Sequence, residues 1–431
     1  MTTTKNNEHK KLNFSSEREQ SQACLNSAEH EKNQGRKVLN VPTLRIPEFQ
    51  GEWEEERLAD IADLYKGTGI SKDQLSDDGE PCILYGELYT KYKSETIREV
   101  ISKTNIDNTK LVRSKANDVI IPCSGETAED IATARCVLNG NILLGGDLNI
   151  IRLHGYDGAF MSYQLNGRRK YDIAKVAQGV SVVHLYGEHL KGVKTINPCL
   201  EEQKEIAKLL SLLDERIATQ NKIIDKLQSL IKGINQRVFM NNGINYKLGE
   251  ICEIRSGYSG NQLLSKKGLK ISRIETISGH KVNLERVGYV APFESSENYK
   301  LQVGDILFSN INSVEYIGNT AFIDKDYDLY HGMNLLRLTP NNMVVIPFYL
   351  YLLLNTNRML NRFKTVCNKA VSQASINQTE LGKTVVQIPD INAQKQICEL
   401  YQALYDKLES EKYANSLFQK QKQYLLRQMF I

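Results

Sequence analysis

The sequence lacks the features of several large protein classes. None of its apolar runs is long enough to span a membrane, and the first residues, MTTTKNNEHKK, are not followed by an apolar core, so no signal peptide is expected. Its eight cysteines are scattered singly, without a CxxC pair. This spacing argues against a zinc knuckle or a disulfide framework and favours reduced thiols in a cytoplasmic protein.

Motifs for nucleotide and cofactor chemistry are also missing. Gly382-Lys383-Thr384 supplies the end of a phosphate-binding loop, but Asn377 stands where that loop requires its first glycine. Asn197-Pro198-Cys199-Leu200 lacks the second proline and the aromatic residue of the amino-methyltransferase loop. His184 and His189 lie near each other, but no Cys, Asp or Glu pattern suggests a metal site around them. The sequence therefore predicts neither catalytic residues nor a metal site.

Length, composition and net charge limit the class of protein only broadly. The chain has 431 residues, enough for two or three domains with cores of their own. Charged residues make up 25% and hydrophobic residues 41%, as in ordinary soluble proteins. The net charge of +4 permits a polyanionic partner and does not require one.

What the sequence does contain is a long apolar heptad repeat, which starts at Pro198 and runs to about Met240. Only Gln220 among its core positions is polar, and the segment would form a helix roughly 60 Å long. Such a repeat is typical of a helix packed along a partner helix, and the alternative is a long buried helix within one large domain. The packing positions are Ile206, Leu210, Leu213, Ile217, Gln220, Ile224, Leu227 and Ile231, followed by Ile234 and Val238.

A second segment of this kind begins at Pro389, about 190 residues later. Gln394 follows Pro389 at the same spacing at which Gln203 follows Pro198. Its apolar packing positions are Ile397, Tyr401, Leu404, Leu408, Phe418, Leu425 and Met429, and the same heptad is interrupted by the polar residues Glu411, Asn415 and Lys422. We expect the two helices to pair antiparallel with Gln220 facing Asn415, which would fix the register. Ile224 would then face Glu411, whose carboxylate would have to lean outward.

The segments that precede the two helices also repeat. Short apolar runs separated by turn residues predict strands of a small curved sheet with helical pieces packed on it. Matching stretches keep the framework residues, whereas the loops between them differ, as expected when one scaffold serves two ligands. The matches pair Leu58, Ile61, Leu64 and Gly67 with Leu248, Ile251, Ile254 and Gly257; Asn117–Ile120 with Gly304–Leu307; Leu148–Leu153 with Met333–Leu338; and Val180, Ser181 and Leu190 with Val371, Ser372 and Leu381.

The predicted fold is therefore α+β, with two similar mixed α/β domains separated by two long antiparallel coiled-coil helices in a pseudo-twofold repeat. The expected divisions are a polar tail at 1–40, a first domain at 41–197, a first long helix at 198–243, a second domain at 244–388 and a second long helix at 389–431.

This order resembles the specificity subunit of type I restriction-modification systems. PTLRIPEFQGEWEEERLADIADLYKG is similar to the family's entry into its first target-recognition domain, and GDILFSNINS to its mid-domain strand and loop. INPCLEEQKEIAKLLSLLDERI and IPDINAQKQICELYQALYDKL are similar to its two conserved helix starts. The resemblance covers residues 41 to 431. Cys199-Leu200-Glu201 and Asp390-Ile391-Asn392 depart from the family's usual helix start, and the N-terminal tail is not part of the pattern.

The resemblance implies a function. Each globular domain would read one half of a split target in double-stranded DNA, and the helix pair would fix the spacer between the halves. Two methyltransferase (modification) subunits, which carry S-adenosylmethionine, would dock on the helices, and restriction/translocase subunits would join that core. This chain would bind no cofactor itself. Two alternatives stay open: a coiled-coil adaptor without a DNA role, and a stand-alone DNA-modifying enzyme with unrecognised motifs.

Candidate DNA contacts follow from basic clusters and from polar loop residues after the matched strands. A basic cluster such as Gly167–Tyr171 can also be no more than a solvated face. Phosphate anchors are expected among Lys115, Arg168, Arg169, Lys170 and Lys175 in the first domain and among Lys266, Lys267, Lys270, Arg273 and Lys369 in the second. Candidate base readers are Ser124, His184, Asn310, Asn312 and Gln373.

Overall fold

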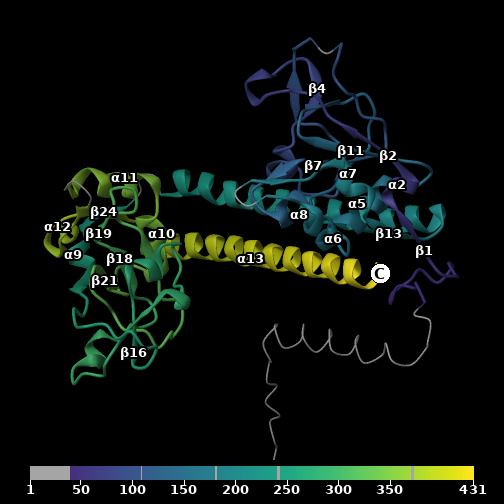
Figure 1. Ribbon diagram of the computed structural model, residues 1–431. Helices are drawn as coiled ribbons and strands as arrows, with labels where there is room; N and C mark the ends of the chain where they lie inside the picture. Colours follow the sequence, from purple (N-terminus) through teal and green to yellow (C-terminus); the bar gives the residue numbers. More distant parts are fainter. Residues whose placement is uncertain (1–38, 108, 180–181, 240–242, 370–372) are drawn as a thin grey trace, which may run out of the picture. The chain divides into compact units, whose positions relative to one another are not determined.

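The computed structural model describes residues 39–107, 109–179, 182–239, 243–369 and 373–431 (Figure 1). Nearly all of the expected polar tail, and the proposed match of Val180-Ser181 with Val371-Ser372, lie outside these ranges. The chain forms two compact units, one up to Glu215 together with Gln419–Ile431, the other Arg216–Phe418. Each unit contains one α/β domain and a part of both long helices.

A five-stranded sheet forms the centre of the first domain, in the order β2-β11-β7-β9-β5. The neighbouring strands are antiparallel except for β9 and β5, which are parallel. Strand β7 is buried along its whole length, which fits its run of apolar residues. The strands are β2 (Ala62–Lys66), β5 (Thr96–Ile97), β7 (Asp118–Pro122), β9 (Arg135–Val137) and β11 (Leu148–Leu153).

Smaller elements complete this domain. A second sheet has the order β10-β4-β6-β3, and β1 pairs antiparallel with β13 just before the first long helix. The other strands are β1 (Glu54–Arg57), β3 (Leu75–Ser76), β4 (Glu80–Ile83), β6 (Ser102–Thr104), β8 (Ser124–Gly125), β10 (Leu143–Leu144), β12 (Val183–His184) and β13 (Lys194–Asn197). The helices are α2 (Leu58–Ile61), η2 (Lys72–Gln74), α3 (Glu87–Thr90), α4 (Ala128–Ile131), α5 (Gly158–Asn166), α6 (Lys170–Val176) and α7 (Gly187–Lys191).

The second domain repeats the central part of this arrangement. Its main sheet has the order β15-β21-β18-β20, and β14 pairs with β24 as β1 pairs with β13. The strands are β14 (Ile244–Lys247), β15 (Cys252–Ser256), β16 (Leu269–Ile271), β17 (Gly288–Val290), β18 (Ile306–Ser309), β19 (Ile311–Asn312), β20 (Thr320–Phe322), β21 (Leu335–Pro340), β22 (Asn368–Lys369), β23 (Ala374–Ser375) and β24 (Val385–Ile388). The helices are α9 (Leu248–Ile251), η3 (Ile274–Ile277), η4 (Leu284–Arg286), η5 (Ser296–Tyr299), α10 (Pro347–Leu354), α11 (Asn357–Val366) and α12 (Gln378–Gly382).

One match between the two domains has to be corrected by two residues. Strand β21 begins at Leu335, so Leu148 of β11 corresponds to Leu335 and not to Met333. Asp147 and Asn334, which precede these strands, both have positive φ, of 59° and 64°, which supports the new alignment. A shift of two keeps every side chain on the same face of a strand, so the apolar pattern alone could not distinguish the two alignments.

The two heptad segments form the long helices α8 (Leu200–Val238) and α13 (Ile391–Gln428). In the first unit, Ile206 and Leu210 share the domain core with Leu425 and Met429. In the second unit, the predicted packing residues form one apolar cluster, so antiparallel pairing is confirmed. That cluster contains Ile224, Leu227, Ile231, Ile234, Ile397, Tyr401, Leu404 and Leu408. Leu213, Ile217 and Phe418 are half-buried.

The predicted contact between Gln220 and Asn415 is wrong. Gln220 donates its side-chain amide to the carboxylate of Glu411 and, at 3.2 Å, to the Glu411 carbonyl. Asn415 instead donates to Asn221 at 2.9 Å. The Glu411 side chain is only 14% exposed, and Lys407 also pairs with it, so it does not lean outward. A buried carboxylate without a hydrogen-bond donor costs more free energy than a buried amide without a partner. This explains why Gln220 donates to Glu411 and not to Asn415.

Candidate nucleic-acid interface

A small sheet next to the central strands carries the candidate base readers of the first domain. Strand β8 follows β7 directly and pairs antiparallel with β12, which places Ser124 opposite His184. The Ser124 hydroxyl lies 3.3 Å from Nδ1 of His184. The backbone bond from Leu185 N–H to the Cys123 carbonyl, at 2.9 Å, continues this pairing. Two residues that lie 60 positions apart in the sequence are thus held together by the rigid core.

Tyr186 belongs to the same site, although the sequence did not single it out. Its ring stacks at 6.2 Å on the His184 imidazole, and the side chain is 51% exposed. An exposed aromatic ring next to polar groups is a surface on which a sugar or base can stack. The sequence could have indicated this residue, because Tyr186 is an aromatic residue two positions after the candidate base reader His184.

The second domain has a corresponding small sheet. Strand β19 follows β18 and pairs with β23, which also pairs with β22. Asn312 lies on β19, where its amide donates to the Ser309 hydroxyl at 3.1 Å. Lys369 on β22 and Gln373 just before β23 are exposed. The Asn310 carbonyl accepts the Ile376 N–H at 2.9 Å, whereas its buried side-chain oxygen has no partner in the described part of the chain.

The two small sheets occupy equivalent places but present different side chains. Ser124 and His184 face each other across β8 and β12. The same backbone pairing in the second domain brings Ile311 opposite Ser375. The framework positions the two sheets in the same way, while the chemistry that they display differs. Such an arrangement can present two different sets of donors, acceptors and apolar groups to two different ligands.

Two arginines of the basic cluster in the first domain donate hydrogen bonds to backbone atoms near the end of the chain. Arg168 donates to the Arg427 carbonyl at 3.0 Å, and Arg169 donates to a backbone oxygen of Ile431 at 3.1 Å. Arg168 therefore binds a carbonyl in the last turn of α13, where the helix dipole favours cations, and Arg169 binds the chain just beyond that helix. These bonds favour a structural role for the two arginines, and their predicted contact with phosphates stays a prediction.

Three lysines of the first domain remain available. Lys115 is exposed on the turn before β7, and Lys170 is half-buried at the first position of α6. Lys175 is exposed and lies 3.9 Å from Asp172 on the same helix. A loose ion pair of this kind contributes little stability and leaves Lys175 free to contact a phosphate.

The basic residues of the second domain fall into two groups. Lys266 and Lys267 are exposed before β16, and Lys270 of β16 lies 3.9 Å from Asp328. Arg273 donates to the side chain of Gln262. This group lies on or beside the sheet of β16 and β17, whereas Lys369 lies on the β19-β23-β22 sheet. The sequence could not separate the two groups, because strand order sets these neighbours.

The second domain also contains a polar hollow with buried charged side chains. It has a volume of about 480 Å³, and its lining includes Arg255, Tyr299, His331 and Arg337. Arg337 is 7% exposed and donates to the carbonyls of Asn298 and Lys300 at 3.2 Å. In the corrected alignment it corresponds to Ile150, which is fully buried in an apolar cluster. The copies therefore differ inside the fold as well as in their loops.

The start of each long helix is fixed to its domain by one glutamine. Gln203 accepts the Asp157 N–H at 2.9 Å and donates to the Pro198 carbonyl at 2.8 Å. Gln394 accepts the Ile346 N–H at 2.8 Å and donates to the Pro389 carbonyl at 2.9 Å. The spacing of proline and glutamine was visible in the sequence, but the role of these glutamines was not.

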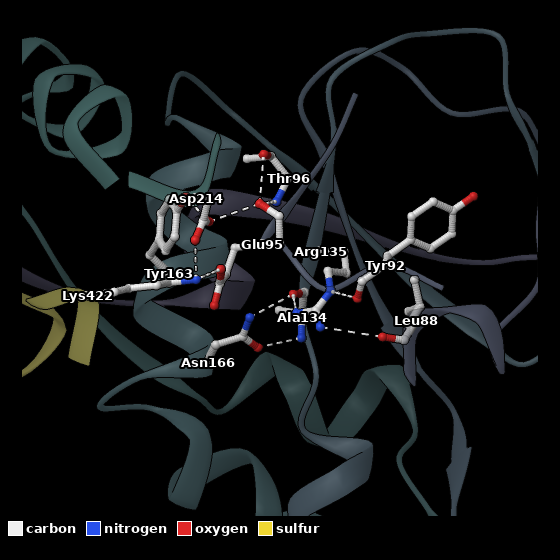
Figure 2. Close-up of polar contacts among 11 residues, drawn as sticks. Leu88, Tyr92, Glu95, Thr96, Ala134, Arg135, Tyr163, Asn166, Asp214 and Lys422 are labelled. Carbon is white, nitrogen blue, oxygen red and sulfur yellow. Dashed lines mark hydrogen bonds and ion pairs between the residues drawn. The ribbon is translucent and has the colours of Figure 1, made fainter. Parts of the chain in front are cut away.

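A buried ionic network joins the first domain to both helices (Figure 2). The Lys422 ammonium lies 2.5 Å from Glu95 and 2.6 Å from Asp214. Tyr163 donates its hydroxyl to Asp214 at 2.8 Å, and Ser94 does so at 2.9 Å. Burial raises the pKa of Glu95, which the charge of Lys422 opposes. In the sequence Lys422 only interrupts the heptad, because a linear pattern does not show a buried partner.

No group of three or more His, Cys, Asp or Glu side chains in the described ranges could hold a metal ion. The cysteines of this part of the chain are free thiols, as expected. Among the helices of the described residues, none is both long and apolar enough to cross a bilayer.

Comparisons with known proteins point to one family. The model of the type I restriction modification DNA specificity domain matches residues 50–229 and 243–416. A putative type I restriction enzyme MjaX specificity subunit of Methanocaldococcus jannaschii is 43% identical over 158 residues, which are 36% of this chain and 37% of that protein. The MjaVIII specificity subunit of the same organism is 24% identical over 413 residues, which are 89% of this chain and 92% of that protein.

Solved structures agree on the fold. The S subunit of a type I restriction-modification system from M. genitalium matches with a TM-score of 0.58 at 18% identity, over 91% of this chain and 99% of its own. A chain from a study of complex assembly and conformational transition of the type I system matches with a TM-score of 0.55 at 16% identity, over 92% of this chain and 99% of its own. At such identities the likeness shows the fold alone.

Proposed function

Because the chain belongs to the type I restriction-modification DNA specificity family, whose model matches both of its domains, we propose that each domain reads one half of a split DNA target. One observation carries this proposal. The same strand pairing occurs twice, with Ser124 opposite His184 in one domain and Ile311 opposite Ser375 in the other. One scaffold that displays two sets of side chains suits two different half-sites.

The side chains have suitable chemistry for this task. A serine hydroxyl and a histidine ring can bond to base edges in the major groove, and an asparagine amide such as that of Asn312 suits adenine. The exposed Lys369, and Lys115, Lys170 and Lys175 in the first domain, are cations suited to phosphate contacts, as are Lys266 and Lys267. Phosphate contacts would position each domain, and the small sheets would supply the sequence preference.

The remaining parts of the complex are proposed by analogy with the family. Two modification subunits would dock on the helix pair and bring S-adenosylmethionine, and restriction/translocase subunits would join them. This chain would then act in the cytoplasm as a non-catalytic DNA-recognition subunit without a cofactor of its own. The absence of recognisable nucleotide-binding motifs in the sequence supports that division of labour.

A domain exchange tests the two-reader proposal. Residues 53–197 are replaced by the same region of a relative with a known target, and methylated adenines are mapped in cells that also carry the modification subunits. We expect one half of the methylated motif to change and the other half to stay. A change in both halves would contradict the proposal.

Point variants locate the readers. Ser124→Ala with His184→Ala should relax the base preference of one half-site, and Asn312→Ala with Gln373→Ala should relax that of the other. Each lost base contact should reduce discrimination by about 1–3 kcal/mol. Lys226→Ala, an exposed position on α8, is the matched control and should leave the motif unchanged.

The two alternatives predict different results. A stand-alone modifying enzyme would methylate DNA when the isolated chain receives S-adenosylmethionine. A coiled-coil adaptor would show no sequence-dependent retention of genomic fragments when the assembled complex is tested by gel shift at moderate salt. Specific retention by the complex, without methylation by the isolated chain, supports the proposed subunit.

A further inference from the structure

The ionic network of the first unit contains two carboxyl groups and two basic side chains. Glu95 and Asp214 are 8% exposed each and supply its two carboxyl groups. Lys422 supplies one positive charge, and Arg135 interacts electrostatically with both carboxylates. Of these four residues only Lys422 lies on α13. The two carboxyl groups therefore have this cation only when α13 is the helix that packs against α8 beside Asp214.

The duplicated fold defines the equivalent place in the second unit. Gln203 and Gln394 make the same contacts, so Asp214 on α8 corresponds to Tyr405 on α13, and Lys422 corresponds to Ile231 on α8. Tyr163 on α5 corresponds in the same way to Leu352 on α10, because Asp157 and Ile346 are matched by the same glutamines.

These equivalent residues are apolar and pack together. Ile231 is 8% exposed, Leu352 is 1% exposed, and both belong to one cluster with Tyr405. A buried charge cluster in one copy thus stands where the other copy has a hydrocarbon core. The difference concerns the helix interface, not a DNA loop, so sequence readout does not explain it.

We propose that the pocket formed by Glu95, Tyr163 and Asp214 is a selective interface: it accepts the Lys422 segment of α13 and rejects α8 of a second copy of this chain. The first half of the chain ends with α8 and the second half with α13. Two identical halves can in principle pair, since each long helix carries an apolar heptad. In a pair of first halves, Ile231 would lie where Lys422 lies. The two carboxylates would then be buried with one cation short, and the twofold symmetry would impose this twice.

A pair of second halves fails for the opposite reason. Lys422 would replace Ile231 among the apolar side chains of that cluster, which include Leu352 and Tyr405, and a buried cation there is costly. The network therefore favours the pairing of unlike halves, and with it two unlike domains on one helix pair. This is discrimination by a penalty on the wrong partner, in addition to attraction for the right one.

The test starts from the full chain. A protease site is placed at residues 240–242, between α8 and β14, and the folded protein is cut there. Cut protein with a tagged first fragment is mixed with cut protein whose first fragment is untagged, and the untagged first fragment captured on the tag is measured. The unaltered sequence should capture almost none.

The decisive variant is Ile231→Lys, which would bring the missing cation to the carboxylates in a pair of first halves. We expect it to raise capture of the untagged first fragment at least about ten-fold. Ile231→Gln is the matched control, because it disturbs the apolar cluster of the second unit without adding charge. Equal capture by the lysine and glutamine variants would overturn the proposal.

A second arm examines the cation itself. Lys422→Met should release the second fragment from the cut protein without increasing capture of first fragments, because the carboxylates still reject α8. Lys420→Met, at an exposed position of the same helix, should behave as the unaltered protein. A Lys422→Met protein that keeps its fragments together as firmly as the Lys420→Met protein would count against the interface.

Discussion

Gln203 accepts a hydrogen bond from the Asp157 N–H at 2.9 Å. Asp157 is the N-cap residue of α5, and Gln203 lies in the first turn of α8. The bond therefore joins the start of a domain helix to the start of the long helix. Gln394 makes the same bond with Ile346, the N-cap residue of α10. Each domain is fixed to its helix by the same device.

Gln203→Ala should destabilise the first unit. The change leaves the Asp157 N–H, in a half-buried residue, and the Pro198 carbonyl without their partner, and an unsatisfied group away from water costs about 1–3 kcal/mol. Gln394→Ala should do the same in the second unit. Urea unfolding measures both, with Gln419→Ala, an exposed glutamine on α13, as the control. Midpoints equal to that of the control would show that the two glutamines are not needed.

Gln220→Leu should lower the stability of the folded protein, because Glu411 would lose a hydrogen-bond donor. The pKa of Glu411 is lowered chiefly by Lys407 and then by the Gln220 amide. A carboxyl group whose pKa is lower in the folded state than in the unfolded state stabilises the fold at pH values above its unfolded-state pKa. This stabilisation is lost as the pH falls through the folded-state pKa. Gln220→Leu should raise the pKa of Glu411 and move that loss to higher pH.

Thermal unfolding between pH 3 and pH 7 would show this shift. Gln220→Leu combined with Glu411→Leu should restore the melting temperature, because two apolar residues replace the amide and the carboxylate together. If Gln220→Leu alone is as stable as the unaltered protein at every pH, the Glu411 contact contributes nothing.

Periodicity in the sequence was sufficient to predict which apolar residues of the long helices are buried, but not the partner of Gln220. The heptads identified Ile206, Ile231, Tyr401 and Leu408 as packing residues, and all four are buried as expected. Duplication identified the matched strands, although a shift of two residues between β11 and β21 could not be seen from alternating side chains. Antiparallel pairing and the two unlike domains were also predictable from the repeat.

Contacts between distant polar residues could not be predicted in this way. Lys422 interrupts the heptad, and only the fold shows that Glu95 and Asp214 surround it. Arg168 and Arg169 formed a basic cluster in the sequence, yet their partners are backbone carbonyls some 260 residues away. A charge pattern shows which groups are present but not which ones a neighbouring element already holds.

Arg168→Ala combined with Arg169→Ala should affect stability and not DNA binding. The change removes two cations from the C-terminal end of α13, each contributing about 0.3–1 kcal/mol. The slope of log affinity against log salt should stay unchanged in the assembled complex, because no phosphate contact is lost. Lys170→Ala with Lys175→Ala is the comparison and should reduce that slope. A reduced slope for the arginine variant would restore the phosphate-anchor interpretation.

His331 should make the second unit sensitive to mild acid. Burial lowers its pKa to about 4, while its Nε2 lies 3.0 Å from the Leu335 carbonyl. The ordinary pKa of about 6.5 applies when the chain unfolds. Between these values the unfolded state binds a proton that the folded state does not, so stability falls as pH decreases from about 6.5 to about 4. Over the whole interval the loss amounts to roughly 3 kcal/mol.

His331→Gln should remove this part of the pH dependence, which urea unfolding at pH 7 and at pH 4.5 would measure. His154→Gln, at an exposed position of the first unit, is the control and should keep the acid sensitivity. A His331→Gln protein that loses as much stability between these two pH values as the control would show that another group is responsible.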